Sequence, residues 1–258
     1  MRLLGVVALP VLSLAVILAA DPPGLGFVQL ASVTRARLVG QMLLTEVAML
    51  VLCAPLAGLF MALGTRPVGD RPPGRSQAVM LILSAWQLGW PLVKRITLMT
   101  ATSALIAFTI RAPIDANTLL LSHVMLWAAA LALATLGVVC APMFEEPLDA
   151  AACAIGVALA ATTPVFVGGP ALDSIPRWLV NASLVANPIV ATAASANIDL
   201  FRMDLLYRLS PLAHGHVEYP AATTTLAAYV LIAAASLLLT ARQFNNRVIR
   251  LSVERMSS

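Results

Sequence analysis

The stretch RSQAVMLILSAWQLGWPLVKR, residues 75–95, decides how often this chain crosses a membrane. Between Arg75 and Lys94 lie 18 residues, most of them apolar. A helix needs about 20 apolar residues to cross the hydrocarbon core of a bilayer, so this stretch is close to the minimum length for a span. If it crosses, every later loop lies on the opposite side of the membrane from the side it would occupy if the stretch stayed on the surface.

The composition places the chain in a membrane. Of its 258 residues 60% are hydrophobic and 11% are charged, and the mean hydropathy is +0.91. A soluble domain has about 25% charged residues and could not hide so much apolar surface in one core. The net charge of +4 is typical of a membrane protein whose Lys and Arg gather on the cytoplasmic side, and does not indicate a nucleic-acid partner.

Six apolar segments predict an all-α integral membrane fold in a single transmembrane domain, residues 1–258. The predicted spans are residues 3–20, 38–64, 96–110, 118–141, 148–168 and 221–241. They must be helices, because a lone strand cannot satisfy its backbone hydrogen bonds in lipid. Residues 169–220 predict an external helical segment before the last span. The first segment also resembles a signal peptide, but its length favours a retained span.

The distribution of the 16 Lys and Arg residues favours a surface position for residues 75–95. If the stretch does not cross, the basic residues divide 10 to 6 between the two sides, with both termini on the richer side. If it crosses, they divide 8 to 8. The positive-inside rule therefore favours six spans with both termini in the cytoplasm.

The residue types of the stretch agree with an interfacial helix over residues 76–91. Its apolar run is interrupted by Ser76, Gln77, Ser84 and Gln87. Trp86 and Trp90 are four positions apart, hence on one helical face, and Trp prefers the membrane–water interface. Pro91 ends the helix just before Lys94, Arg95 and the next span.

This arrangement resembles the permease subunits of type-2 ABC exporters. In that family the second span leads to a cytoplasmic Glu-Arg pair, a Gly-Thr, a Leu-rich helix ending in Ser, and a Lys that opens the third span. The corresponding residues here are Asp70, Arg71, Gly74, Leu81, Leu83, Ser84 and Lys94. The family's external segment before the last span has a counterpart in residues 169–220, including Asn187-Pro188.

The resemblance implies that residues 76–91 form a coupling helix that docks on an ATPase subunit. The residues implied in this coupling are Asp70, Arg71, Arg75, Leu83, Ser84, Trp86, Trp90, Lys94 and Arg95. The expected partners are a pair of separate ATPase subunits and a second permease, identical or related. The sequence contains no GxxxxGK[ST] pattern, so ATP hydrolysis is expected on another chain, and no cofactor is expected.

Glu46 and His123 are the candidate functional residues inside the membrane. Glu46 lies about eight residues from the outer end of the second predicted span, roughly 12 Å deep at 1.5 Å per residue. A charge at that depth is costly and marks a substrate contact or a proton site by default. The alternative is a structural pairing with His123 or Arg111, and His123 alone is typical of helix packing.

Other chemistry-bearing residues give weaker signals. Cys53, Cys140 and Cys153 lack CxxC spacing and are expected to be small buried hydrophobes. His214, His216 and Glu218 are too few to predict a metal site. Small residues four apart, Ala130 with Ala134 and Ala152 with Gly156 and Ala160, predict close helix packing.

The expected function is export through the cytoplasmic (inner) membrane by the permease subunit of an ABC system, and the chain itself is not expected to be an enzyme. A non-transporting assembly or anchoring subunit is the alternative. A secondary transporter has thinner support, because one intramembrane carboxylate and no broken-helix pair are expected from the sequence. The substrate stays open.

Overall fold

The computed structural model describes residues 32–64, 90, 94, 97–109, 111–112, 114–167, 174–200 and 218–257 of the chain. Within these residues all regular structure is helical and no strand occurs. Four helical stretches are long and apolar enough to cross a membrane: Val39–Leu63, Ala116–Cys140, Pro147–Phe166 and Ala222–Gln243. The chain therefore has the architecture of a multi-pass α-helical membrane protein, as its composition predicts.

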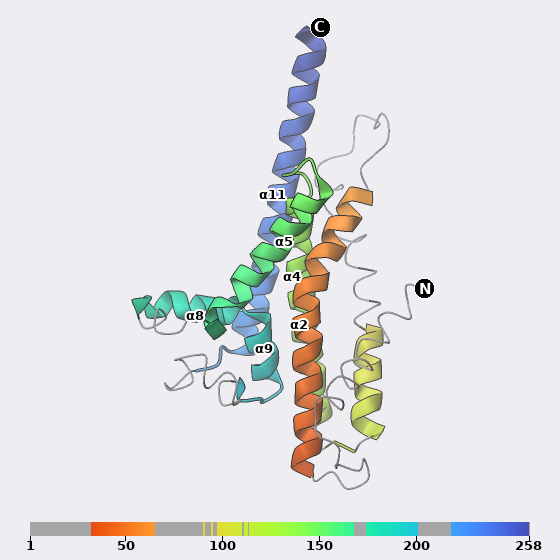
Figure 1. Ribbon diagram of the computed structural model, residues 1–258, viewed down its shortest axis with the longest axis vertical. Helices are drawn as coiled ribbons and strands as arrows, with labels where there is room; N and C mark the ends of the chain where they lie inside the picture. The colour runs from red at the N-terminus through yellow and green to blue at the C-terminus, as the bar shows by residue number, and fades with distance from the viewer. Residues whose placement is uncertain are drawn as a thin grey trace.

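These stretches belong to five helices. The first is part of α2 (Ser32–Gly64) and the second is the whole of α4 (Ala116–Cys140). The third runs through α5 (Pro147–Thr162) and α6 (Pro164–Val167), and the last is the first part of α11 (Ala222–Ser257). In Figure 1 the C-terminal ends of α2 and α11 lie at one end of the molecule, where the turn between α4 and α5 also lies.

The helix Thr97–Thr109 occupies most of the predicted span 96–110 and is short. It is apolar but falls below the length of the four spanning stretches, at roughly 20 Å for a rise of 1.5 Å per residue. The predicted span 3–20 lies outside the described residues, as does nearly all of the interfacial helix 76–91. The number of six spans and the coupling helix therefore stay predictions.

A sharp turn joins the helix Thr97–Thr109 to α4. The Ala112 N–H donates to the Ala107 carbonyl at 2.9 Å, and Arg111 has a left-handed φ of 51°. Asp115 then caps α4, because its Oδ1 accepts the Thr118 N–H at 2.7 Å. This backbone hydrogen bond and a second one from the Thr118 hydroxyl lower the pKa of the exposed Asp115 carboxyl.

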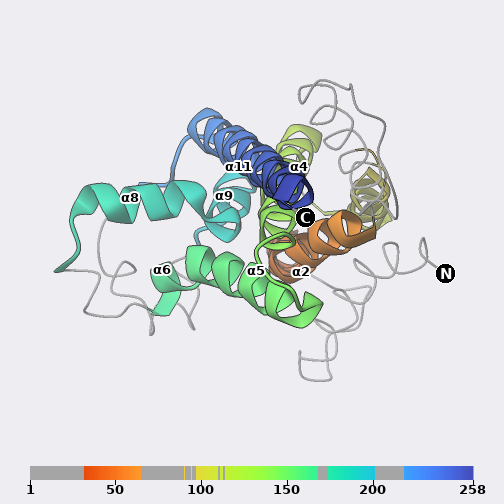
Figure 2. The same cartoon turned by 90° about the horizontal axis from the view of Figure 1, so that it is seen from above.

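Helix α4 is the centre of the fold. Viewed from above, it is surrounded by α2, α5, α9 (Pro188–Ser195) and α11 (Figure 2). Its predicted small positions, Ala130 and Ala134, are both fully buried. By contrast, Ala152, Gly156 and Ala160 of α5 face outward, and space is open around Gly156. The small-residue pattern thus marks close packing within the chain on α4 but not on α5.

Two glycines allow α2 and α4 to touch through their backbones. A Cβ atom on Gly58 would collide with the carbonyl oxygen of Ala134, and one on Gly137 would collide with the carbonyl oxygen of Pro55. Pro55 itself lies inside α2 and supplies no N–H to the helix ladder. The upper part of α2 leans away from its lower part in Figure 1, the bend that an internal proline produces.

Between α6 and α11, where the sequence predicts an external helical segment, the chain forms a bent helix pair. Helix α8 (Arg177–Ala186) and α9 meet at Asn187 with a bend of 74° and together are apolar enough to count as one broken span. Figure 1 shows α8 lying across the long axis and α9 running along it. The expectation of no broken-helix pair is wrong, because Asn187-Pro188 ends one helix and starts another without an intervening loop.

Candidate functional site

Three helices bring one polar side chain each to the same point in the core. Glu46 comes from α2, Ser103 from the helix Thr97–Thr109 and His123 from α4. Glu46 and Ser103 are 0% exposed and His123 is 1% exposed. A carboxyl and an imidazole buried this completely in a membrane-spanning fold must satisfy each other or be satisfied by close neighbours.

Ser103 bonds one oxygen of the carboxyl. Its Oγ lies 2.6 Å from Oε1 of Glu46 and 2.9 Å from the carbonyl oxygen of Met99, one turn earlier in its own helix. A hydroxyl has one proton to donate and two lone pairs to accept with. If Glu46 is ionised, Ser103 donates to it. If Oε1 carries a proton, Ser103 accepts that proton and donates to Met99. Either state is satisfied without a change of geometry.

His123 faces the other oxygen of the carboxyl. Its Nδ1 lies 2.8 Å from the carbonyl oxygen of Leu119, so this nitrogen carries a proton and donates it. Its Nε2 lies 3.7 Å from Oε2 of Glu46, an ion-pair contact longer than a hydrogen bond. In the described chain neither of these two atoms has a hydrogen-bond partner.

The described residues pack a large apolar cluster around the helices that form this site. The cluster takes residues from all three helices: Val39, Met42, Leu43 and Val47 of α2, Met99 and Ala107 of the helix Thr97–Thr109, and Leu126 and Ala130 of α4. A net charge on the Glu46–His123 pair would be a buried lone ion in these surroundings, which costs on the order of several kcal/mol. The pair is therefore most stable when the charges of Glu46 and His123 sum to zero.

The structure answers part of the question that Glu46 raises in the sequence. Glu46 pairs with His123, whereas Arg111 is exposed in the turn before α4. Ser103 is a member of the site that the sequence did not single out. Its segment contains Thr97, Thr100, Thr102 and Thr109 as well, so no pattern distinguishes it from the other small polar residues of that helix.

Most of the residues implied in ATPase coupling lie outside the described part of the chain. These are Asp70, Arg71, Arg75, Leu83, Ser84, Trp86 and Arg95. The two that are described contact each other: the Lys94 ammonium lies 5.1 Å from the centre of the Trp90 ring, a cation–π contact. Trp90 is 47% exposed. An amphipathic pair of this kind suits a membrane–water interface.

Asn187 fastens the bent pair to the fold and is fully buried. Its Oδ1 accepts the N–H groups of Ile189 and Val190 at 2.9 and 3.3 Å, which caps α9. Its Nδ2 donates to the carbonyl oxygen of Thr162 at the end of α5, at 2.8 Å. One side chain thus fixes the direction of α9 relative to α5.

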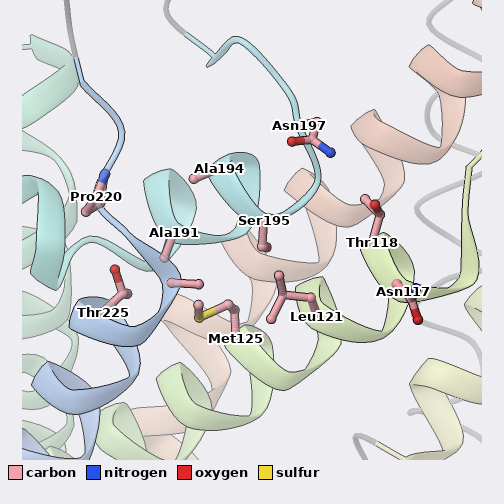
Figure 3. Close-up of a pocket in the computed structure, with 11 residues that line it drawn as sticks. Asn117, Thr118, Leu121, Met125, Ala191, Ala194, Ser195, Asn197, Pro220 and Thr225 are labelled. Atoms are coloured by element: carbon pink, nitrogen blue, oxygen red, sulfur yellow. The ribbon is translucent and has the colours of Figure 1, made fainter.

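A shallow pocket opens between α4, α9 and the start of α11 (Figure 3), with a volume of about 230 Å³. Its polar lining residues are Asn117, Thr118, Ser195, Asn197 and Thr225. Leu121 and Met125 form part of its apolar wall. Because none of the described residues that line it is charged, they offer hydrogen bonds but no electrostatic anchor. None of the residues singled out from the sequence lines it.

The described residues hold no group of three or more His, Cys, Asp or Glu that could bind a metal ion. His214 and His216 lie outside them. Cys140 is buried as expected, and its Sγ lies 3.8 Å from that of Cys153; both are free thiols. Cys53 is exposed on the apolar surface of α2, contrary to the expectation of burial.

Comparison with known proteins adds no relative: no family model, no curated protein and no solved structure matches this chain.

Proposed function

We propose that this chain is the membrane-spanning permease subunit of an ATP-driven export system, with ATP hydrolysed on a separate ATPase subunit. Two such permeases, identical or related, would enclose the path of the cargo. Residues 70–95 would contact the ATPases on the cytoplasmic side of the inner membrane, where both termini would also lie. The proposal starts from the resemblance to type-2 ABC exporter permeases.

The observation that carries the proposal is the bent pair α8–α9 immediately before the last apolar helix. The resemblance implies a long external segment at this place, and the chain builds there a broken helix packed into the core. Val190, Ala191 and Ala193 of α9 are buried. In Figure 1 this pair lies away from the end where α2 and α11 finish, which suits opposite sides of the membrane.

The contact between Trp90 and Lys94 gives a second, weaker support. The segment that leads from α2 to the helix Thr97–Thr109 ends in an exposed aromatic ring under a cation. A coupling helix must be held at the membrane surface, because only then does a movement of the ATPase also move the helix Thr97–Thr109 that follows.

The test is co-purification from the native membrane followed by substitution. Trp90→Ala and Lys94→Ala should reduce the amount of ATPase that co-purifies and uncouple ATP hydrolysis. Trp178→Ala is the matched control, because Trp178 is 70% exposed on α8, away from the proposed coupling segment. The proposal fails if no ATPase accompanies the chain, or if the two variants behave as the control does.

The alternative of a non-transporting anchoring subunit gives a different outcome. An anchoring subunit would co-purify with a complex whose transport or enzymatic turnover is unchanged by Trp90→Ala and Lys94→Ala, as long as the complex stays assembled. Turnover measured on the assembled complex separates the two functions.

A further inference from the structure

We propose that Glu46 and His123, supported by Ser103, form a proton-binding site inside the membrane that holds one proton while the three helices are packed and releases it to water when they separate. The site does not depend on the proposed export function. It follows from the geometry of the three side chains and from the apolar core around them.

The number of protons follows from the hydrogen-bonding groups. Nδ1 of His123 donates to the Leu119 carbonyl, so in the neutral imidazole Nε2 has only a lone pair. An ionised Oε2 of Glu46 would also offer only lone pairs, at 3.7 Å. With no further proton the site would hold a buried lone carboxylate. With one proton, on either residue, the pair is neutral. With two, it is a buried lone cation.

Burial makes the one-proton state the stable one. Both residues are at most 1% exposed, and the described cluster that packs between their helices is apolar. Removing one charge of a buried pair, or adding one, leaves an uncompensated charge in a medium of low dielectric constant. The packed helices therefore resist both loss and gain of a proton.

Among the described residues, no other ionisable side chain is near enough to replace either partner. The helix Thr97–Thr109 and α9 contain none. On α4 the nearest are Asp115 and Cys140, and on α2 they are Arg37 and Cys53, each about 10 Å or more along its own helix axis at 1.5 Å per residue. On α5 they are Asp149, in its first turn, and Cys153. On α11 it is Tyr229, which packs further along α4 with Ala129 and Ala132. The charge balance of the site thus rests on Glu46 and His123 together.

Separation of the helices changes the proton count. In water an ordinary carboxyl and an ordinary imidazole together hold about one proton near pH 5.5 and almost none above about pH 7.5. The packed pair holds one proton at both pH values. Separation of the helices at pH 5.5 therefore releases no proton, whereas separation at pH 7.5 or above releases about one. As the pH rises, proton release favours the separated state.

The helix Thr97–Thr109 is the element whose position this site controls. It contributes Ser103, and it directly follows residues 70–95. If the proposed function is correct, the position of the helix next to the ATPase contact depends on the protonation of the Glu46–His123 pair. That last link rests on the proposed function; the proton site does not.

The experiment measures unfolding of the purified full chain in mixed micelles between pH 5.5 and 8.5. In the wild type the ratio of unfolded to folded protein should rise about tenfold per pH unit above about pH 7, because one proton is released. Glu46→Gln keeps the size of the side chain and removes its titration, so its profile should be flat above pH 7. Glu145→Gln, in the exposed turn between α4 and α5, should keep the wild-type slope.

A direct proton count gives the second readout. Unfolding at pH 7.5 in a weakly buffered solution with an indicator dye should release about one more proton from the wild type than from Glu46→Gln. The double variant Glu46→Gln/His123→Gln replaces the pair by two neutral amides and should behave as Glu46→Gln does. Equal proton release from the wild type and from whichever of these two variants folds, or parallel pH profiles, would overturn the proposal. Neither readout involves an ATPase, so its failure is distinct from failure of the export function.

Discussion

Gly58 of α2 packs directly against the backbone carbonyl of Ala134 in α4, because neither residue has a side chain large enough to keep the two helices apart. Three residues further along α4, Gly137 packs against the carbonyl of Pro55 in the same way. In lipid, helices associate through such close contacts, since burial of apolar surface gives no advantage over contact with lipid chains. This crossing positions the helices that supply Glu46 and His123.

Gly58→Ala should destabilise the fold by about 1–3 kcal/mol, since the added methyl group forces the two backbones apart. The free energy of unfolding in mixed micelles measures it. Gly156→Ala is the matched control, because nothing lies within 4 Å of a Cβ at that position on α5. It should change the stability by less than about 0.5 kcal/mol. Equal effects of the two variants would show that the close crossing does not contribute to stability.

Ser103→Ala should destabilise the fold by about 1–2 kcal/mol, because Oε1 of Glu46 loses its hydrogen-bond partner inside the membrane. Thr109→Val serves as the control on the same helix. The Thr109 hydroxyl is exposed and bonds the Leu105 carbonyl at 2.7 Å, so its loss should have little effect. Thermal unfolding of both variants at one pH gives the comparison. A Ser103→Ala variant as stable as Thr109→Val would contradict the role assigned to this hydroxyl.

Asn187→Ala should cost about 2–3 kcal/mol, because α9 loses its cap and the Thr162 carbonyl loses its donor. Asn187→Ser separates the two contributions: the hydroxyl oxygen still caps α9 but is too short to reach the Thr162 carbonyl, so this variant should be less destabilising than Asn187→Ala. Asn181→Ala, at an exposed position on α8, is the control. Unfolding free energies of the three variants check the order. If Asn187→Ala and Asn181→Ala were alike, Asn187 would not hold the bent pair in place.

Asp115 should make the start of α4 sensitive to acid. Its hydrogen bonds with Thr118 lower the pKa of the carboxyl from an ordinary value of 3.8. The stabilisation is therefore fully present above pH 3.8 and is lost as the pH falls through the lowered value in the folded state. Asp115→Asn keeps the cap and should remove this acid-dependent part. A carboxyl titration followed by NMR in the wild type measures the pKa directly; a midpoint at or above 3.8 would be inconsistent with the cap.

The sequence predicted the helical membrane class correctly from composition and segment lengths, and it identified Glu46 and His123 as candidates because charges deep in a span are rare. It offered His123 and Arg111 as alternative partners of Glu46 and could not decide between them. Contact between α2 and α4 depends on the crossing at Gly58 and Gly137, and such a crossing has no signature that fixes which face of each helix is turned toward the other. Ser103 was missed for the same reason, since its partner is 57 positions away in the sequence.

The sequence by itself determined that this protein folds in a lipid bilayer. Long apolar segments with few charges require a bilayer, and a bilayer requires helices, because every backbone group must find its partner within the same segment. Only the tertiary structure decided what the rare polar residues do. Three side chains with little meaning on separate helices become one buried acid–base site when backbone contacts bring the helices together. Likewise, the sequence places Asn187-Pro188 between two helical stretches, but only packing against the end of α5 makes it the corner of a broken helix. Both outcomes depend on contacts between distant parts of the chain.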